Sequence, residues 1–340
     1  MTTTRAANPP RGVRIAGTGC YLPPKVLSNR DLESMMDTSD EWIVQRTGIR
    51  ERRMIDRANG ETTTSIAAAA LTRALDDARM KPTDLDMLIV ATVSMEMTCP
   101  STSCRVAEAI GAGHCGAVDL SAACCGFVYA TNFAHELVKG GAYRTVGVIG
   151  VDVLTPLMDY CTEGRGTAIL FGDAAGAAVY TATDDPTKGI IAQAMHSDGH
   201  GWKHLYIPRE PRDFPEDADP ARRKLGLMYM NGREVYKFAV TRFQDLIAQT
   251  LDKAGLRADD IDQFVCHQSN ARILEAARER FGIPHEKFYT NIERVGNTSA
   301  GSVPVCLDEL RRAGRIHDGQ KVLLVAFGGG LTWASSLWQL

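Results

Sequence analysis

The sequence predicts an α/β protein built from two duplicated halves. Helical segments alternate with short apolar strands along the chain, and one segment occurs twice. Leu75–Ala91 aligns without a gap with Leu251–His267, and five positions are identical. Each copy joins the end of an amphipathic helix to an apolar strand. We therefore expect halves at residues 12–182 and 183–340, after a disordered N-terminus at residues 1–11.

The elements of the first half follow one another at short intervals. Most strands are apolar along their whole length, which predicts a sheet covered on both faces. In chain order we expect a strand at Val13–Gly17, a helix at Thr62–Met80, a strand at Met87–Thr92, a buried strand at Ala117–Leu120, a helix from Cys124 to Gly140, a strand at Thr145–Val151, and two strands around a glycine-rich bend in Ala168–Tyr180.

The second half repeats parts of this order. The apolar strand Lys321–Phe327 resembles the strand that follows Gly141, and Phe327–Gly330 resembles Phe171–Ala174. A charged segment with several prolines, residues 208–220, interrupts this half, and it is typical of a surface excursion.

The composition excludes several classes of protein. The chain is 44% hydrophobic and 23% charged with a net charge of -3, which indicates neither a nucleic-acid-binding protein nor an acidic tail. Nine cysteines occur without a C-x-x-C pair, as expected in a reducing cytoplasm. The polar N-terminus lacks the apolar core of a signal peptide, and no run is long enough to span a membrane. We expect a cytoplasmic protein.

Cys124 stands where a predicted strand turns into a helix. The start of a helix carries partial positive charge, which favours a thiolate and can stabilise an oxyanion. This position suits a nucleophile, although these residues alone favour two small core cysteines, since most free cysteines are buried core residues. The choice depends on what lies opposite.

The second half offers two polar side chains at corresponding places. His267 follows an apolar strand, and Asn297 precedes a predicted helix. Because sites in α/β sheets form at the carboxyl ends of strands, we expect both to face Cys124 across the pseudo-symmetry axis. A thiolate can accept an acyl group, while His and Asn donors can hold an enolate oxygen. The glycines of Phe327–Trp333 can add a backbone N–H.

Other classes fit less well. A papain-like hydrolase uses Cys, His and Asn but is not a duplicated α/β fold. A dinucleotide-binding dehydrogenase needs the pattern G-x-G-x-x-G after the first strand. Ala16–Pro23 lacks the third glycine of this pattern. His196, His200 and His204 have some of the spacing of a metal site, but a polar loop explains them better. Trp42 and Arg46, one helical turn apart, indicate either a solvated surface or a platform for a flat phosphorylated ligand.

Seven motifs carry a resemblance to a known family. They are Asp37–Arg53, Asp119–Phe127, Gly164–Thr167, Phe171–Ala178, His267–Asn270, Gly296–Ser302 and Phe327–Trp333. From about Val13 to Leu340 the chain resembles the β-ketoacyl-[acyl-carrier-protein] synthase III family of the thiolase-like superfamily. The resemblance implies a five-layer α-β-α-β-α sandwich and a homodimer.

The resemblance also implies roles for individual residues. Cys124 is expected to be the acylated nucleophile, and His267 and Asn297 are expected to bind the malonyl thioester carbonyl and stabilise the enolate. The backbone N–H groups of Gly329 and Cys124 correspond to an oxyanion hole. Residues expected to bind coenzyme A are Trp42, Arg46 and Arg165. Residues expected to dock the carrier protein are Lys237 and Arg272, with Arg278 and Arg280 extending a basic patch.

The implied reaction is ping-pong and needs no metal or redox cofactor. Acyl-CoA acylates Cys124, and malonyl-acyl carrier protein then loses CO2 and attacks the acyl-enzyme. Cys99 occupies a position where several family members have a bulky aromatic that reaches into the partner's acyl pocket, so we expect a roomier pocket for longer or branched primers. A related acyltransferase or condensing enzyme of secondary metabolism remains an alternative, as does a redox-sensing thiol.

Overall fold

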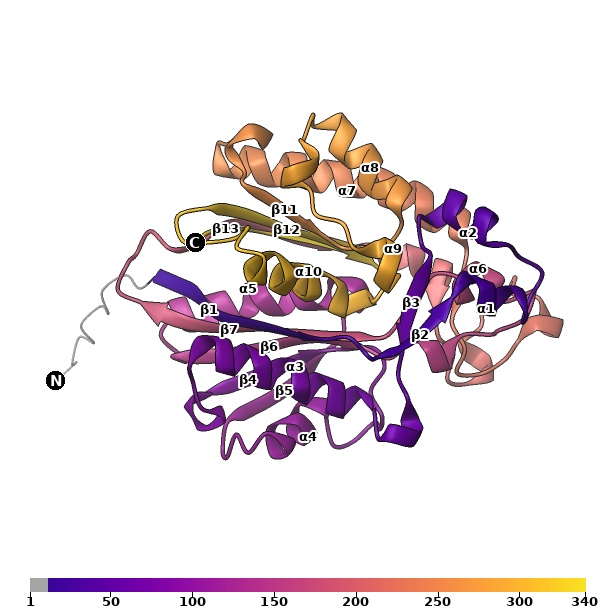
Figure 1. Cartoon of the computed structure of the whole chain (residues 1–340), viewed down its shortest axis with the longest axis horizontal. Coiled ribbons are helices and arrows are strands. Elements are labelled where there is room, and N and C mark those ends of the chain that lie inside the picture. The colour runs from indigo at the N-terminus through magenta and orange to yellow at the C-terminus, as the bar shows by residue number, and fades with distance from the viewer. Residues whose placement is uncertain (1–11) are drawn as a thin grey trace.

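Two mixed β-sheets lie one above the other, with helices below, between and above them (Figure 1). The computed structural model describes residues 12–340, so the expectation for residues 1–11 lies outside the described residues. The first sheet has the order β1 (Gly12–Tyr21), β7 (Ala174–Thr183), β6 (Thr145–Asp152), β4 (Met87–Ala91), β5 (Gly116–Leu120). The second has the order β11 (Gln263–Cys266), β12 (Lys321–Gly328), β13 (Thr332–Gln339), β8 (Gly189–Ser197).

The helices form three layers, which gives the expected five-layer sandwich. The outer layer on the first sheet contains α3 (Thr63–Ala78) and α4 (Thr102–Ala109), and the outer layer on the second contains α7 (Gly232–Ala254) and α8 (Ala271–Arg280). The middle layer contains α5 (Gly126–Lys139) and α10 (Ser302–Arg312), which contact both sheets. The middle helices are buried around most of their circumference, as their mainly apolar and small residues predict.

The two halves share one strand arrangement. In the first sheet β4 runs parallel to β6, while β7 and β1 follow antiparallel. In the second sheet β11 runs parallel to β12, while β13 and β8 follow antiparallel. The repeated segments fall at the same places, the end of α3 with β4 and the end of α7 with β11. The duplication expected from the sequence is therefore present, although the boundary between residues 182 and 183 remains a prediction.

Two expectations about strands are wrong. Residues 168–180 contain the end of a helix and a single strand, β7, because the residues between them pair elsewhere: Phe171 forms an isolated bridge with Asn297, and the Asp173 N–H donates to the Arg53 carbonyl at 2.8 Å. Residues 117–120 are not buried, because β5 is the edge strand and pairs only with β4.

The remaining elements gather at one end of the sandwich, to the right in Figure 1. They are β2 (Lys25–Ser28), α1 (Asn29–Glu33), α2 (Asp40–Thr47), β3 (Glu51–Met54), α6 (Arg165–Ala168), β9 (Leu205–Tyr206), β10 (Tyr229–Met230) and α9 (Ile292–Val295). Short 3-10 turns join them, including η3 (Ala123–Cys125), η4 (Thr155–Leu157) and η10 (Ser299–Gly301). The charged segment, residues 208–220, lies between β9 and β10 and is largely exposed. Within residues 12–340, no helix is both long and apolar enough to cross a membrane.

Candidate active site

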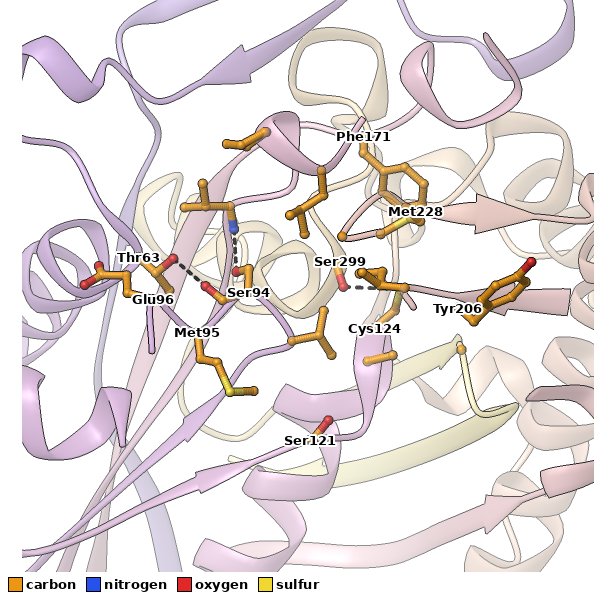
Figure 2. A pocket seen from close by; sticks show the side chains of 18 of the residues that line it. Thr63, Ser94, Met95, Glu96, Ser121, Cys124, Phe171, Tyr206, Met228 and Ser299 are labelled. Carbon is orange, nitrogen blue, oxygen red and sulfur yellow. Dashed lines mark hydrogen bonds between the residues drawn. The ribbon is translucent and has the colours of Figure 1, made fainter. Parts of the chain in front are cut away.

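Cys124 lies in the turn η3, between the edge strand β5 and the middle helix α5. The preceding residue, Ala123, has φ +46°, a left-handed conformation that costs a non-glycine residue free energy. The turn places the Cys124 side chain on the wall of a cavity of about 820 Å³ (Figure 2). Cys125 is fully buried in the middle layer and does not line that cavity. The structure thus separates the two cysteines that the sequence left side by side.

The Cys124 thiol is protonated in this structure. Burial raises its pKa to about 12, while a hydrogen bond from Ser299 and the backbone N–H groups of Cys124 and Gly329 act in the opposite direction. The start of α5 is expected to favour the thiolate, and burial of the sulfur acts in the opposite direction. A thiolate must be stabilised when substrate binds.

A glycine-rich turn after β12 lies against the nucleophile. A Cβ atom built on Gly328 would come within 2.8 Å of the Cys124 Cβ and 3.1 Å of its sulfur, so only glycine fits there. The backbone N–H of the next residue, Gly329, lowers the pKa of the Cys124 thiol. These N–H groups are suitably placed for an oxyanion that forms next to the sulfur.

Asn297 reaches the same site through η10. Its carboxamide oxygen accepts a hydrogen bond from the Ser299 N–H at 2.9 Å, and the Ser299 hydroxyl donates to the Cys124 sulfur at 3.4 Å. The bond from Ser299 occupies the oxygen of the Asn297 side chain, so the amide N–H₂ is the group left to act as a donor. Asn297 is held by the backbone at both ends, because its N–H donates to Leu170 and its carbonyl accepts from Gly172.

His267 follows β11, beside the end of β12. Its ring packs edge-on against Phe327 with the ring centroids 5.5 Å apart, and Phe327 precedes the glycine that touches Cys124. Burial lowers the pKa of His267 to about 3, so the imidazole is neutral at physiological pH. Among residues 12–340 no hydrogen bond joins His267 to Cys124, and the His267 Nδ1 atom is buried without a partner. A neutral ring can donate one hydrogen bond to an oxygen that develops negative charge.

Helix α2 carries a second predicted group of residues. The guanidinium of Arg46 lies 4.5 Å from the Trp42 ring centroid and that of Arg165, on α6, lies 5.0 Å from it. The three residues predicted to bind coenzyme A are thus brought together from two distant segments. Cation–π contacts of this kind form a flat, positively charged platform.

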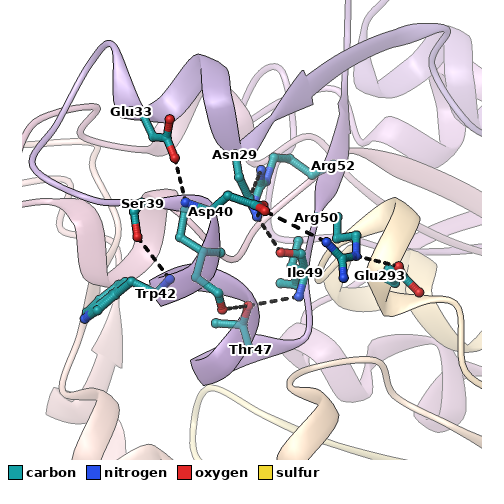
Figure 3. Close-up of polar contacts among 11 residues, drawn as sticks. Asn29, Glu33, Ser39, Asp40, Trp42, Thr47, Ile49, Arg50, Arg52 and Glu293 are labelled. Carbon is teal, nitrogen blue, oxygen red and sulfur yellow. Dashed lines mark hydrogen bonds and ion pairs between the residues drawn. The ribbon is translucent and has the colours of Figure 1, made fainter.

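A buried polar network fixes α2 to the rest of the fold (Figure 3). The Asn29 amide donates to Asp40, the first residue of α2, and to the Ile49 carbonyl, both at 2.7 Å. Arg52 is completely buried and donates to Asn29 at 2.9 Å. The Ser39 hydroxyl caps the helix by accepting from the Trp42 N–H at 3.2 Å. The orientation of Trp42 therefore depends on buried residues.

Comparison with known proteins places this arrangement in a family. Residues 118–199 match the family described as 3-oxoacyl-[acyl-carrier-protein] synthase III, and residues 251–340 match its C-terminal part. The β-ketoacyl-[acyl-carrier-protein] synthase III of Caldanaerobacter subterraneus subsp. tengcongensis is 46% identical over 95% of this chain and 96% of its own. The chain belongs to the β-ketoacyl-[acyl-carrier-protein] synthase III family. It is an acyltransferase of the condensing type.

Solved structures of the family have the same fold. The 3-oxoacyl-[acyl-carrier-protein] synthase III of Aquifex aeolicus VF5 superposes with a TM-score of 0.88 at 40% identity, covering 97% of this chain and 100% of its own. The priming β-ketosynthase of the R1128 polyketide biosynthetic pathway also gives 0.88, at 34% identity and 98% coverage of both chains.

The residues predicted to dock a carrier protein lie on neighbouring outer helices. Lys237 on α7 and Arg272 on α8 are exposed, and the Arg272 guanidinium packs 5.6 Å from the Tyr236 ring centroid. Arg280 is also exposed and donates to Gln244 at 2.6 Å. Arg278 differs, because it forms an ion pair with Glu275 and donates to the Ile283 carbonyl. Three of the four predicted cations are thus available to a partner, while Arg278 is engaged within the fold.

Cys99 lies apart from the cavity of its own chain. It is exposed and does not line the cavity that contains Cys124. Its predicted effect on the acyl pocket therefore depends on a second copy of the chain and remains a prediction. Of the histidines considered for a metal site, His196 stacks on Trp333 and forms a hydrogen bond with Gln249.

The sequence analysis did not single out Ser299 or Asp152, although both lie at the site. Ser299 belongs to the same motif as Asn297, and Asp152 is the last residue of the fully buried strand β6. A carboxylate at the carboxyl end of a buried strand was a usable signal. The Ser299 contact was harder to predict, because it depends on two turns that are 175 residues apart.

Proposed function

We propose that this chain joins an acyl-CoA primer to malonyl-acyl carrier protein by decarboxylative Claisen condensation, giving a 3-oxoacyl-acyl carrier protein, coenzyme A and CO2. The observation that carries the proposal is the position of Cys124, whose sulfur lies on the cavity wall within 3.4 Å of a hydrogen-bond donor and next to the N–H of Gly329. A thiol so placed suits acyl transfer.

In the first half-reaction the Cys124 sulfur attacks the carbonyl carbon of the acyl-CoA. A bond forms between sulfur and carbon, the bond to the coenzyme A sulfur breaks, and the thiol proton ends on coenzyme A. The N–H groups of Cys124 and Gly329 stabilise the oxyanion, while Trp42, Arg46 and Arg165 hold the nucleotide end of coenzyme A.

In the second half-reaction the malonyl thioester loses CO2 and leaves an enolate. We assign the enolate oxygen to His267 and Asn297, whose side chains can each donate one hydrogen bond. The neutral state of His267 suits this role, since a buried donor with no charge can stabilise developing negative charge without prior desolvation of an ion. The carbanion then forms a bond to the acyl carbonyl carbon, the bond from that carbon to the Cys124 sulfur breaks, and the freed thiolate takes up a proton from water. Each step uses groups of the chain, of the two thioesters and of water, so the proposal includes no metal or redox cofactor.

We also propose how the protein is assembled and located. The exposed apolar side chains of Val118 on β5 and Phe133 on α5 support a homodimer, and nine unpaired cysteines support a cytoplasmic location. The exposed cations Lys237, Arg272 and Arg280 would bind the acidic carrier protein.

For the primer, we propose an acyl chain longer or more branched than acetyl. The proposal rests on Cys99, a small residue where several members of the family have a bulky aromatic, and the cavity at Cys124 has a volume of about 820 Å³. A series of acyl-CoAs assayed side by side tests this, and a clear preference for acetyl-CoA would contradict it. A starter role in polyketide synthesis is the second candidate, supported by the 34% identity to a priming β-ketosynthase.

The decisive experiment separates the two half-reactions. Intact-protein mass spectrometry after incubation with acyl-CoA should find one acyl group on the wild type and on the matched control Cys125→Ala, and none on Cys124→Ala. Added malonyl-acyl carrier protein should then release CO2 and 3-oxoacyl product. Asn297→Ala should keep the acyl adduct and lose the product. Loss of the adduct in Asn297→Ala would refute this division of roles, and oxidised forms without any acyl adduct would favour a redox-sensing thiol.

A further inference from the structure

Two strained turns meet at the nucleophile. Within residues 12–340, three non-glycine residues have positive φ angles: Arg79, Ala123 and Ser299. Arg79 ends helix α3, which is a common place for a left-handed residue. Ala123 and Ser299 have φ angles of +46° and +49°. Ala123 directly precedes Cys124, and Ser299 itself donates the hydrogen bond to the Cys124 sulfur. Backbone strain that persists at such a place indicates a functional constraint.

The contact itself is short and shielded from water. The Ser299 hydroxyl donates to the Cys124 sulfur at 3.4 Å, and both residues are buried (Figure 2). Within residues 12–340, Ser299 is the residue whose side chain donates a hydrogen bond to the Cys124 sulfur. His267, by contrast, makes no such bond. A hydrogen bond to a charged acceptor is stronger than one to a neutral acceptor, so this contact gains strength as the sulfur becomes a thiolate.

Asp152 holds the turn that carries Ser299. Its carboxylate accepts a hydrogen bond from the N–H of Ala300, the residue after Ser299, at 3.2 Å. It also accepts from the Val93 N–H at 2.9 Å and from the Ser94 hydroxyl at 3.1 Å. A buried carboxylate with several donors is rigidly placed, and it therefore ties η10 to the segment after β4. Its charge also raises the pKa of the Cys124 thiol, whereas the hydrogen bond from Ser299 lowers that pKa.

We propose that Ser299 is a catalytic residue of the acylation step, whose hydroxyl donates a hydrogen bond to the Cys124 sulfur and stabilises it as a thiolate while it attacks the thioester. The proposal rests on the assigned role of Cys124 as the nucleophile. The bonds that form and break are those of the first half-reaction, and the thiol proton still ends on the sulfur of coenzyme A. Decarboxylation of the malonyl group places no charge on the acylated sulfur, but the sulfur departs as a thiolate when the carbanion displaces it. The same hydrogen bond therefore acts in acylation and on the leaving group of condensation, and it leaves the release of CO2 unaffected.

Two variants remove the hydroxyl with opposite effects on strain. Ser299→Ala keeps a Cβ atom in the left-handed conformation, whereas Ser299→Gly relieves the strain. Both keep the backbone N–H that holds Asn297. Thr298→Val is the matched control, because the Thr298 hydroxyl is also buried but has no hydrogen-bond partner.

The test is the rate at which iodoacetamide alkylates Cys124, followed by mass spectrometry from pH 6 to pH 10. This reaction needs a thiolate but no acyl-CoA, so its outcome does not depend on the proposed substrates. We expect both Ser299 variants to shift the alkylation profile up by about one pH unit, and to be acylated about tenfold more slowly at pH 7. Variants that are acylated to completion and freed of coenzyme A should release CO2 from malonyl-acyl carrier protein at the wild-type rate, because decarboxylation places no charge on the sulfur.

Several results would overturn the proposal. An unchanged alkylation profile in Ser299→Gly would show that the hydroxyl does not stabilise the thiolate. A similar shift in Thr298→Val would attribute the effect to packing, and an equal loss in the rate of CO2 release by the acylated enzyme would make the role structural. If the profile shifts as expected but no acyl-CoA acylates any variant or the wild type, the proposed substrates fail while the role of Ser299 at the sulfur stands.

Discussion

Gly328 and Gly329 are neighbours in one turn, but they have very different room beside the nucleophile. A Cβ atom on Gly328 would lie 2.8 Å from the Cys124 Cβ and 2.9 Å from its N atom, closer than packed atoms approach. On Gly329 the nearest atom would be the Ala123 Cβ at 3.5 Å, an ordinary contact. Gly328→Ala should therefore displace the nucleophile and slow acylation on the order of 100-fold. Gly329→Ala should keep its N–H and most of the rate.

This pair is measured by single-turnover acylation of each variant, with thermal unfolding as the check on folding. Equal losses in both variants would mean that the turn tolerates no side chain at either position. A Gly328→Ala variant as active as the wild type would show that the two turns move apart easily, and the rigid arrangement at Cys124 would then be wrong.

His267 makes the stability of the protein depend on pH. Its pKa in the folded state, about 3, lies below the ordinary value of 6.5 because of burial, so the unfolded chain binds more protons as the pH falls below 6.5. The stability associated with a neutral His267 is complete above pH 6.5 and is lost as the pH falls toward 3. Between pH 7.5 and pH 5 the wild type should lose about 2 kcal/mol more unfolding free energy than His267→Gln. Urea titrations at both pH values measure this difference, and parallel losses would contradict the low pKa.

For individual residues, the sequence predicted where a side chain lies better than it predicted the burial and the contacts of that side chain. Cys124 and Asn297 lie at the same site, as the strand–turn–helix pattern and the duplication predict. The protonated state of Cys124 could not be predicted, because burial depends on both sheets closing over η3. The engagement of Arg278 by Glu275 and the Ile283 carbonyl likewise depends on contacts that a basic pattern does not reveal.

Among the elements, α2 depends most on a single buried side chain. Asn29 is 1% exposed and links the start of α2, the Ile49 carbonyl and the buried Arg52. Asn29→Ala would remove one hydrogen bond from each of these groups, although Arg52 keeps its bonds to the Leu27 and Ile169 carbonyls, and this should cost about 1 to 3 kcal/mol of stability. Because α2 carries Trp42, the KM for acyl-CoA should rise severalfold while the acylation rate at saturation changes little.

The exposed Asn59 provides the control for this prediction. Asn59 bonds Asp56 at the surface at 2.9 Å, so Asn59→Ala should leave both stability and KM near the wild-type values. A normal KM in Asn29→Ala, despite lower stability, would show that α2 does not need this network to hold the Trp42 platform.

Elements with strong periodicity were predicted closely. The expected helix at 62–80 is α3, at Thr63–Ala78, and the expected strand at 145–151 is β6, at Thr145–Asp152. The segment around Phe171 was predicted wrongly, because its extended backbone bonds Asn297 and Arg53 rather than a neighbouring strand. Local β-propensity cannot distinguish an extended segment that belongs to a sheet from one that bonds single residues of other segments.

At the scale of the whole molecule, duplication explains why the two halves meet at one site. Both sheets have a parallel pair followed by two antiparallel strands, and the turns after β5, β11 and β12 approach each other at the same end of the sandwich. The halves differ at their edges, since β5 extends the first sheet by one full strand while the second has only an isolated bridge between Phe264 and Phe288 at that position. The edge strand β5 therefore has no full counterpart in the second sheet.

This edge is the place where we expect the homodimer to form. Val118 on β5 and Phe133 on α5 are each 42% exposed, and they border a shallow apolar hollow of about 470 Å³. An unpaired edge beside an apolar surface favours association with a second copy. Val118→Asp should convert the dimer to a monomer in size-exclusion chromatography with light scattering, because two copies would bring the introduced charges together on the same edge. Ile191→Asp is the matched control, since Ile191 is also 42% exposed on an edge strand, β8, whose neighbours are more polar. A dimer that survives Val118→Asp but dissociates in Ile191→Asp would move the interface to the second sheet.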